Sequence, residues 1–304
     1  MCSREGIAVL DGMDCETGQR RRSVEEIFRG LSQKTMKWSS YFPVYQSLVA
    51  PFAGKPVTIV EIGVLNGGSL VMWRELLGPD ARIIGVDVNE NARRMEEQGF
   101  EIFIGDQADQ GFWDSFFQSV GEIDVLVDDG GHTNRQQIVT LTKALPRVRD
   151  GGVVIIEDTH ASFMKGFANP SPRSFMNFAK HVADCIQARS PHVTHTSGAP
   201  FAGLVHAVTF YESMVAFRVD RRLAKPAEEV HVGREEIGAV CLRHAFDVQA
   251  YVEGLGARIA RVAGPGAGKR MTSLANRVVG RAMRFSLVRE NARLKSYFRV
   301  DPKA

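Results

Sequence analysis

Two short stretches place acidic side chains together at the ends of apolar runs. The first is VDDGGH at residues 127–132, and the second is VVIIEDTH at residues 153–160. In each stretch, an apolar run typical of a buried strand leads into two adjacent carboxylates. Neighbouring carboxylates at a strand end repel each other, so the arrangement is costly unless a cation lies between them. The two stretches together therefore predict a cation site at one edge of a sheet.

Three of these carboxylates are candidate ligands for Mg²⁺, or for Mn²⁺ in its place. They are Asp129 at the end of one strand, and Glu157 and Asp158 at the end of the next. Mg²⁺ takes oxygen ligands in near-octahedral geometry and usually keeps positions for water or substrate. The ends of adjacent strands lie about 5 Å apart, so the three side chains can converge. A divalent cation there would lower the pKa of a hydroxyl and make it a better nucleophile.

A histidine follows the first acidic pair across a two-glycine turn. His132 lies three residues beyond Asp129 and can face the same cavity. The ordinary pKa of histidine is near neutrality, which suits a general base. We therefore expect His132 and Asp129 to act together, with His132 accepting the proton of an acceptor hydroxyl.

A glycine-containing turn upstream indicates a cofactor site. VEIGVLNGGS, residues 60–69, has the order of a strand, a turn and a helix start. Gly63 and Gly67 allow the backbone to pass close to a ligand, and a helix start offers free N–H groups. The stretch matches neither the dinucleotide pattern nor a phosphate loop. On its own it fits an ordinary tight turn equally well.

Acids at the ends of the next two strands favour the cofactor interpretation. Asp87 ends the second strand, where an acid binds ribose hydroxyls in doubly wound folds. Asp106 ends the third, and with Gln107 it forms an acid and amide pair suited to an adenine edge. Either acid alone is as readily a solvated loop residue. Three strand ends that open onto one crevice favour a nucleoside cofactor.

Strands and helices alternate regularly between residues 57 and 158. The strands are continuously apolar, as in a sheet covered on both faces. This order predicts an α/β, doubly wound, Rossmann-like sheet that is mostly parallel. Two β-type runs in VHAVTFYESMVAFRV, residues 205–219, predict a C-terminal antiparallel hairpin. Ser23 and Glu26 have the spacing of a capping box and predict a short N-terminal helix.

Composition divides the chain into three parts. We expect a leader and helices over 1–54, the α/β domain over 55–222 and an extension over 223–304. Residues 255–304 carry 12 Lys and Arg against two acidic residues, whereas the whole chain carries 38 against 35. Apolar residues at helical spacing predict a basic amphipathic helix there. We expect this helix to pack on the body of the protein or on a second copy in a homo-oligomer. The alternative is contact with a membrane surface.

Several function classes are disfavoured. The N-terminus mixes charges into its short apolar run, unlike a signal peptide, and no window of 18 apolar residues predicts a membrane span. Four scattered cysteines indicate reduced thiols. We expect a cytoplasmic protein, and the basic tail is a candidate for contact with the inner face of the membrane. Nucleic acid is not an expected partner, because the tail shows no nucleic-acid-binding module.

The motifs together resemble a known family. EIGVLNGGSL, GVDVN, IGDQAD, VDDGGH and GGVVIIEDTH are similar to motifs of class I S-adenosylmethionine-dependent methyltransferases. They are most like the metal-dependent sugar O-methyltransferases of macrolide and bacterial polysaccharide pathways, a group that also carries the label cephalosporin hydroxylase. The resemblance covers roughly residues 38–219. It implies Mg²⁺ on Asp129, Glu157 and Asp158, with His132 as base. It implies S-adenosylmethionine against Glu61, Gly63, Gly67, Ser69, Asp87, Asp106, Gln107 and Asp128.

Three functions follow from these expectations. The first is methylation of a sugar hydroxyl, in an oligosaccharide or in a small glycosylated natural product. The second is methylation of a catechol-type phenol. Its hydroxyl has a lower pKa than a sugar hydroxyl, and a metal still promotes loss of its proton. The third is a non-catalytic scaffold that binds S-adenosylmethionine. The polar stretch SFMKGFANPSPRS, residues 162–174, mildly favours a sugar acceptor.

Overall fold

The computed structural model describes residues 21–190, 193 and 201–226, with isolated positions between 228 and 292. The chain divides into two compact units, residues 1–229 and residues 230–304. All the elements below belong to the first unit. The leader before residue 21 lies outside the described residues, as does the expected basic helix apart from isolated positions, so the contacts expected of that helix stay predictions. Among the described residues, no helix is long and apolar enough to cross a membrane.

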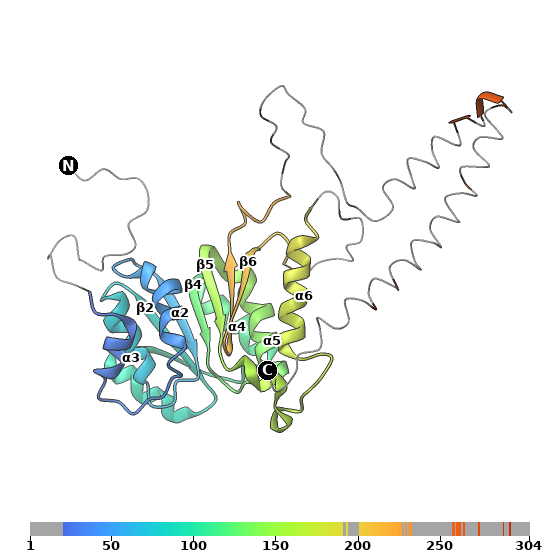
Figure 1. Cartoon of the computed structure of the whole chain (residues 1–304). Helices are drawn as coiled ribbons and strands as arrows, with labels where there is room; N and C mark the ends of the chain where they lie inside the picture. The colour runs from blue at the N-terminus through green and yellow to red at the C-terminus, as the bar shows by residue number, and fades with distance from the viewer. Residues whose placement is uncertain are drawn as a thin grey trace. The chain divides into compact units, whose positions relative to one another are not determined.

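A seven-stranded sheet forms the centre of the first unit (Figure 1), with the strand order β3-β2-β1-β4-β5-β7-β6. Strands β1 to β5 pair in parallel, whereas β7 runs antiparallel to both β5 and β6. The predicted doubly wound sheet with a closing hairpin is confirmed. The strands are β1 (Thr58–Ile62), β2 (Arg82–Asp87), β3 (Glu101–Ile104), β4 (Ile123–Asp128), β5 (Val148–Ile156), β6 (Val205–Tyr211) and β7 (Met214–Val219).

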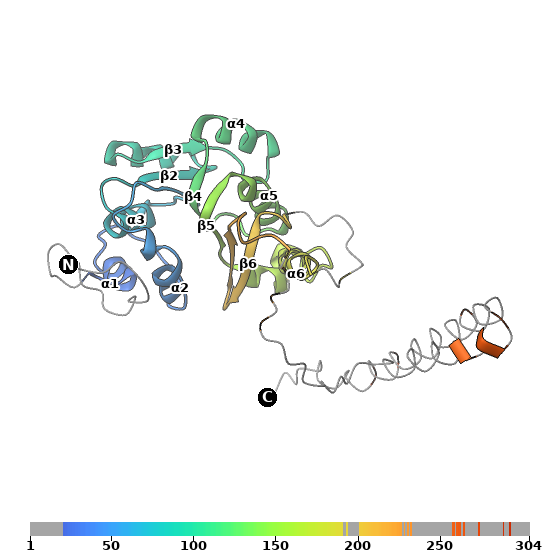
Figure 2. The same ribbon diagram turned by 90° about the horizontal axis from the view of Figure 1, so that it is seen from above.

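Helices cover both faces of this sheet (Figure 2). Helices α1, α2 and α3 lie on one face, and α4, α5 and α6 lie on the other. The predicted capping box of Ser23 and Glu26 is present at the start of α1. The helices are α1 (Val24–Arg29), α2 (Tyr41–Leu48), α3 (Gly68–Leu77), α4 (Gln110–Val120), α5 (Asn134–Ala144) and α6 (Phe175–Gln187).

Alternate residues of each strand enter two separate cores. In β4, Val125 and Val127 pack with α1 to α3, whereas Leu126 packs with α4 to α6. Trp73 and Trp113 are fully buried, one in each core. Both faces of the sheet are covered, and this explains why the strands are apolar runs without alternation.

One of the helical segments between the strands is not an α-helix. Residues Glu90–Gln98 form a 3₁₀ helix, which then ends at Gly99 in the left-handed region. The segment buries only Ala92 and Met95. In a 3₁₀ helix, residues three apart lie on the same side, so both side chains reach the core together.

The strand order reverses between β1 and β4. In doubly wound sheets, ligands bind beyond the carboxyl ends of the strands at this switch point. The loops that follow β1, β2, β4 and β5 meet there, and they carry most of the motifs found in the sequence.

Candidate active site

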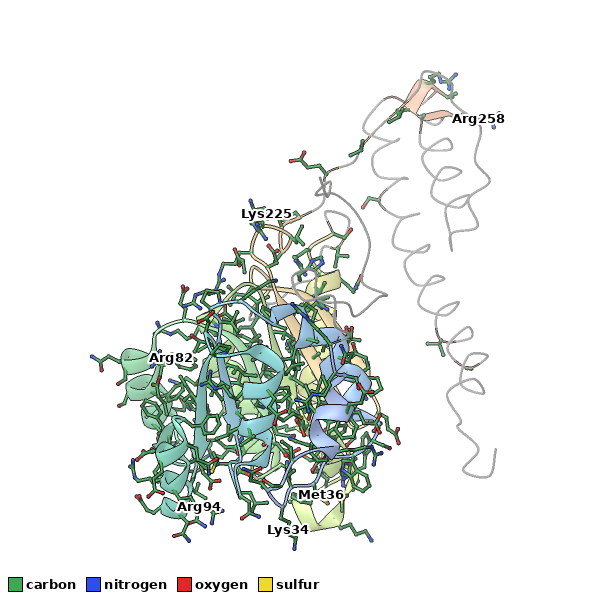
Figure 3. All side chains as sticks on the ribbon, turned by 90° about the vertical axis from the view of Figure 1, so that its left-hand side faces the viewer. Lys34, Met36, Arg82, Arg94, Lys225 and Arg258 are labelled. Carbon is green, nitrogen blue, oxygen red and sulfur yellow. The ribbon has the colours of Figure 1, made fainter. Side chains whose placement is uncertain are left out.

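A cavity of about 410 Å³ opens at the carboxyl ends of the central strands. The loops after β1, β2, β3, β4 and β5 line it, together with residues 35–38 and Tyr41 from the segment around the start of α2. Figure 3 shows Lys34, Met36 and Arg94 together at this lower end of the domain. Small-molecule sites usually have volumes of about 300–1,000 Å³. The predicted crevice is therefore a cavity large enough for a cofactor.

The glycine loop after β1 packs tightly on its neighbours. Gly63 has φ +91°, and a Cβ there would lie 2.1 Å from the carbonyl oxygen of Asp129. Gly67 has φ +76° and caps α3, and a Cβ there would lie 2.3 Å from the side chain of Met95. Both glycines are thus required by the turn and by close packing within the protein. Gly63 also lines the cavity.

Asp87 at the end of β2 holds the glycine loop in place. Its Oδ2 accepts hydrogen bonds from the backbone N–H groups of Val64, at 2.9 Å, and Leu65, at 3.1 Å. Its Oδ1 accepts from the N–H of Asn89. The carboxylate also lines the cavity. Asp87, which was predicted to bind the ribose hydroxyls, therefore lies at the cavity and holds the loop beside it in shape.

Gln107 is buried and bonded on both sides of its amide. Its Nε2 donates to both oxygens of Asp128, at 2.9 and 3.0 Å, and its Oε1 accepts from the N–H of Gly131 at 2.9 Å. Burial raises the pKa of Asp128 to about 6, although the bonds from Gln107 and from the N–H of Gly130 lower it. Gln107 thus supports the loop after β4 from within the protein.

The eight predicted cofactor residues do not all reach the cavity. Asp106 is exposed, and its carboxylate accepts from the N–H of Ala108 at 2.7 Å. Glu61 and Asp128 are fully buried. Burial raises the pKa of Glu61, and its Oε2 has no hydrogen-bond partner among the described residues. The residues that line the cavity are Gly63, Ser69, Asp87 and Gln107, and those that do not are Glu61, Gly67, Asp106 and Asp128.

Asp129, His132 and Asp158 form a group that can hold a divalent cation. One ligand atom from each lies within 4.8 Å of the others. The Nε2 of His132 lies 3.4 Å from an oxygen of Asp158. The two carboxylates are the oxygen ligands that Mg²⁺ and Mn²⁺ take, with open positions for water and substrate, and the imidazole of His132 lies beside them.

The backbone is strained at two members of this group. His132 has φ +57° and Asp158 has φ +52°, both in the left-handed region. This conformation costs a non-glycine residue about 1–2 kcal/mol. Such strain persists where the surrounding structure holds it, and it concentrates at functional sites.

Glu157 faces a different set of partners. It is fully buried and accepts hydrogen bonds from Lys37 Nζ, at 3.1 and 3.0 Å, and from the hydroxyl of Tyr45. Burial raises its pKa to about 8 against the opposing charge of Lys37. The structure thus brings Asp129 and Asp158 together with His132, whereas both oxygens of Glu157 are bonded to Lys37, which also bonds Asp129.

Sequence reasoning missed two residues of the site, both from the segment before the α/β domain. The buried Lys37 donates to Asp129, and its pKa is lowered by burial but raised more by Glu157 and the other carboxylates, so that it stays charged. The hydroxyl of Tyr41 donates to Asp158 Oδ1 at 2.5 Å. Neither residue lies in a recognisable motif. The one available signal is a lysine between apolar residues in TMKWSSYF, residues 35–42.

The comparison with known families decides what this part of the chain is. Residues 60–159 match the family model described as a methyltransferase domain. This part of the chain is a methyltransferase domain. Its sheet, with antiparallel strands at the C-terminal end, is the Rossmann-like fold of the class I S-adenosylmethionine-dependent enzymes, as its structural neighbours show.

Similar proteins act on sugars in antibiotic pathways. The chain is 32% identical over 208 residues to a Streptomyces olivaceus enzyme named 8-demethyl-8-(2-methoxy-alpha-L-rhamnosyl)-tetracenomycin-C 3'-O-methyltransferase, covering 64% of this chain and 51% of the relative. It is 30% identical to the mycinamicin VI 2''-O-methyltransferase of Micromonospora griseorubida, covering 59% and 47%. The chain thus spans about half the length of the curated relatives it matches.

A solved structure has the same fold as the methyltransferase domain. It is the MycE methyltransferase of the mycinamycin biosynthetic pathway, in complex with Mg and SAH. The TM-score is 0.60 with 25% sequence identity, covering 67% of this chain and 55% of that chain.

Proposed function

We propose that this protein transfers a methyl group from S-adenosylmethionine to a sugar hydroxyl, with the help of a divalent cation. The observation that carries the proposal is the group of Asp129, His132 and Asp158, which lines the cofactor-sized cavity. The names of the similar proteins support a sugar acceptor, and the Mg and SAH of the MycE complex support both cofactors. The acceptor is an oligosaccharide or a glycosylated natural product.

The residues at the cavity would bind and orient the cofactor. Gly63, Ser69 and Asp87 line the side of the cavity beside the glycine loop, where a nucleoside would lie. When bound, S-adenosylmethionine supplies an electrophilic methyl group. Asp129 and Asp158 also line the cavity, so an acceptor hydroxyl held between them and the cofactor would be in position for transfer.

His132 is the proton acceptor in this proposal. Its imidazole is partly exposed, and its Nε2 lies 3.4 Å from an oxygen of Asp158, which would orient the ring. A divalent cation, when bound, would add positive charge that promotes loss of the hydroxyl proton. Asp129 and Asp158 would hold the cation and keep the acceptor within reach of His132. Glu157, predicted as a third ligand, would complete the set only by exchanging its bonds to Lys37.

Removal of divalent metal tests the proposal. Methyl transfer from labelled S-adenosylmethionine is measured with mycinamicin VI and with a panel of other glycosides. EDTA should abolish transfer, and added Mg²⁺ should restore it. Full turnover in EDTA would contradict the metal role.

Calorimetry separates an enzyme from a scaffold. Titration of the protein with S-adenosylmethionine should give a stoichiometric heat of binding. No binding would contradict the proposed activity altogether, whereas binding without transfer to any glycoside in the panel would favour a scaffold.

A further inference from the structure

A buried ammonium group joins carboxylates from three strands. The Nζ of Lys37 lies 2.7 Å from Asp129 Oδ2, 3.0 Å from Glu157 and 3.5 Å from Glu61. Only 2% of the lysine side chain is exposed. Glu61 belongs to β1, Asp129 follows β4 and Glu157 follows β5, so one cation connects all three strands at the switch point of the sheet.

Such a group is stable only because its charge is paired. A buried ion costs several kcal/mol unless close opposite charges and hydrogen bonds compensate it. Lys37 is compensated by three carboxylates, and the ring of Tyr45 lies 5.9 Å from its Nζ. The hydroxyl of Tyr45 also donates a hydrogen bond to Glu157, which holds this carboxylate in place beside Lys37. The ammonium is therefore held in a single position.

Lys37 is the one anchor of the Asp129 carboxylate. Among the described residues, no other side chain or backbone group donates a hydrogen bond to it, and the carboxylate is otherwise partly exposed. Asp158 is held separately, by the hydroxyl of Tyr41. The two candidate ligands thus depend on different residues of one short segment. The loss of Lys37 would release Asp129, and Glu157 would lose its bonds to Lys37 as well, whereas Asp158 would keep its bond from Tyr41.

We propose that Lys37 is a positioning residue for the divalent cation, which it serves by holding the carboxylate of Asp129 toward His132 and Asp158. The inference rests on the metal dependence proposed above. Groups that orient a metal ligand typically contribute 10- to 100-fold to metal affinity. A positive charge near the site also repels a cation, so the sign of the change on removing Lys37 decides between anchoring and repulsion.

Manganese binding to the full chain tests the inference without any turnover. Free Mn²⁺ is titrated by electron paramagnetic resonance against the wild type, Lys37→Met and Lys37→Gln. Anchoring predicts affinity about 10- to 100-fold weaker in Lys37→Met. Lys37→Gln keeps a hydrogen-bond donor and should lose less. The matched control is Lys34→Met, because Lys34 is exposed on the same segment (Figure 3), and its affinity should equal that of the wild type.

A double substitution separates positioning from a general loss of structure. If Lys37 acts through Asp129, then Lys37→Met should add little to the loss already caused by Asp129→Ala, whereas independent effects would multiply. The affinity for S-adenosylmethionine is measured beside that for Mn²⁺, and an equal fall in both affinities in Lys37→Met would show a general loss of structure and overturn the role. Lys37→Gln provides the measurement if Lys37→Met fails to fold.

The outcomes distinguish the two proposals. Unchanged or tighter Mn²⁺ binding in Lys37→Met, or multiplicative losses in the double variant, would overturn the role of Lys37 and leave the proposed function intact. A wild-type chain that binds no Mn²⁺ would refute the metal dependence and the inference together.

Discussion

Replacement of Gln107 by leucine tests how the loop carrying Asp129 and His132 is supported. Leucine has a similar size but cannot hydrogen-bond. The variant loses two bonds to the buried Asp128 and leaves the N–H of Gly131 without its acceptor. Because Gly131 is only partly buried, the lost acceptor should cost about 0.5–1.5 kcal/mol at every pH, the usual net contribution of a hydrogen bond.

A second part of the loss should depend on pH. The pKa of Asp128 is already raised to about 6 by burial, so the folded state binds its proton more tightly than the unfolded state does. Stability therefore falls as pH rises from about 4 toward 6 and is then level. Hydrogen bonds to a charged group contribute about 1.5–3 kcal/mol, and without them the pKa should rise by a further one to two units. The decline in the variant should then continue toward pH 8.

Urea unfolding at pH 5 and pH 8.5 measures both parts. The buried Trp73 and Trp113 report the transition by fluorescence. The difference between wild type and Gln107→Leu should be larger at pH 8.5 by about 1.5–3 kcal/mol. Gln118→Leu on the exposed side of α4 is the matched control and should show no such difference. A gap of equal size at both pH values would refute the assignment of Gln107 as the support of ionised Asp128.

Three further predictions concern the site itself. His132→Ala should lower turnover about 10²- to 10⁴-fold with cofactor affinity intact, and the loss should shrink at high pH because hydroxide replaces the base; pH–rate profiles with saturating cofactor check this. His132→Gly should be more stable than His132→Ala by about 0.5–1 kcal/mol in urea unfolding, because glycine tolerates φ +57°. Tyr41→Phe removes a bond to Asp158 and should weaken Mg²⁺ binding roughly 10-fold in calorimetry, whereas equal affinity would show that Tyr41 has only a packing role.

Much of the fold was predictable because its determinants are local. Continuous apolar runs indicate strands buried on both faces, and the alternation of strands with helices leaves a parallel sheet as the simplest arrangement. The first polar residue after each apolar run then indicates where that strand ends. This is why Asp87, Asp129 and Asp158 were expected at one edge and do lie there. Periodicity does not distinguish an α-helix from a 3₁₀ helix, so the geometry of Glu90–Gln98 was not predictable.

The partner of each charge was decided by tertiary structure. Lys37 precedes Asp129 by 92 residues and Glu157 by 120, and no spacing rule relates positions so far apart. Strand ends determine which carboxylates share an edge, but a buried carboxylate takes whichever cation or donor the rest of the chain brings to it. For this reason the sequence alone determined the fold and the acidic edge. Only the packing of the segment around the start of α2 over that edge decided that Glu157 and Asp129 share Lys37, whereas Asp158 is bonded to Tyr41 beside His132.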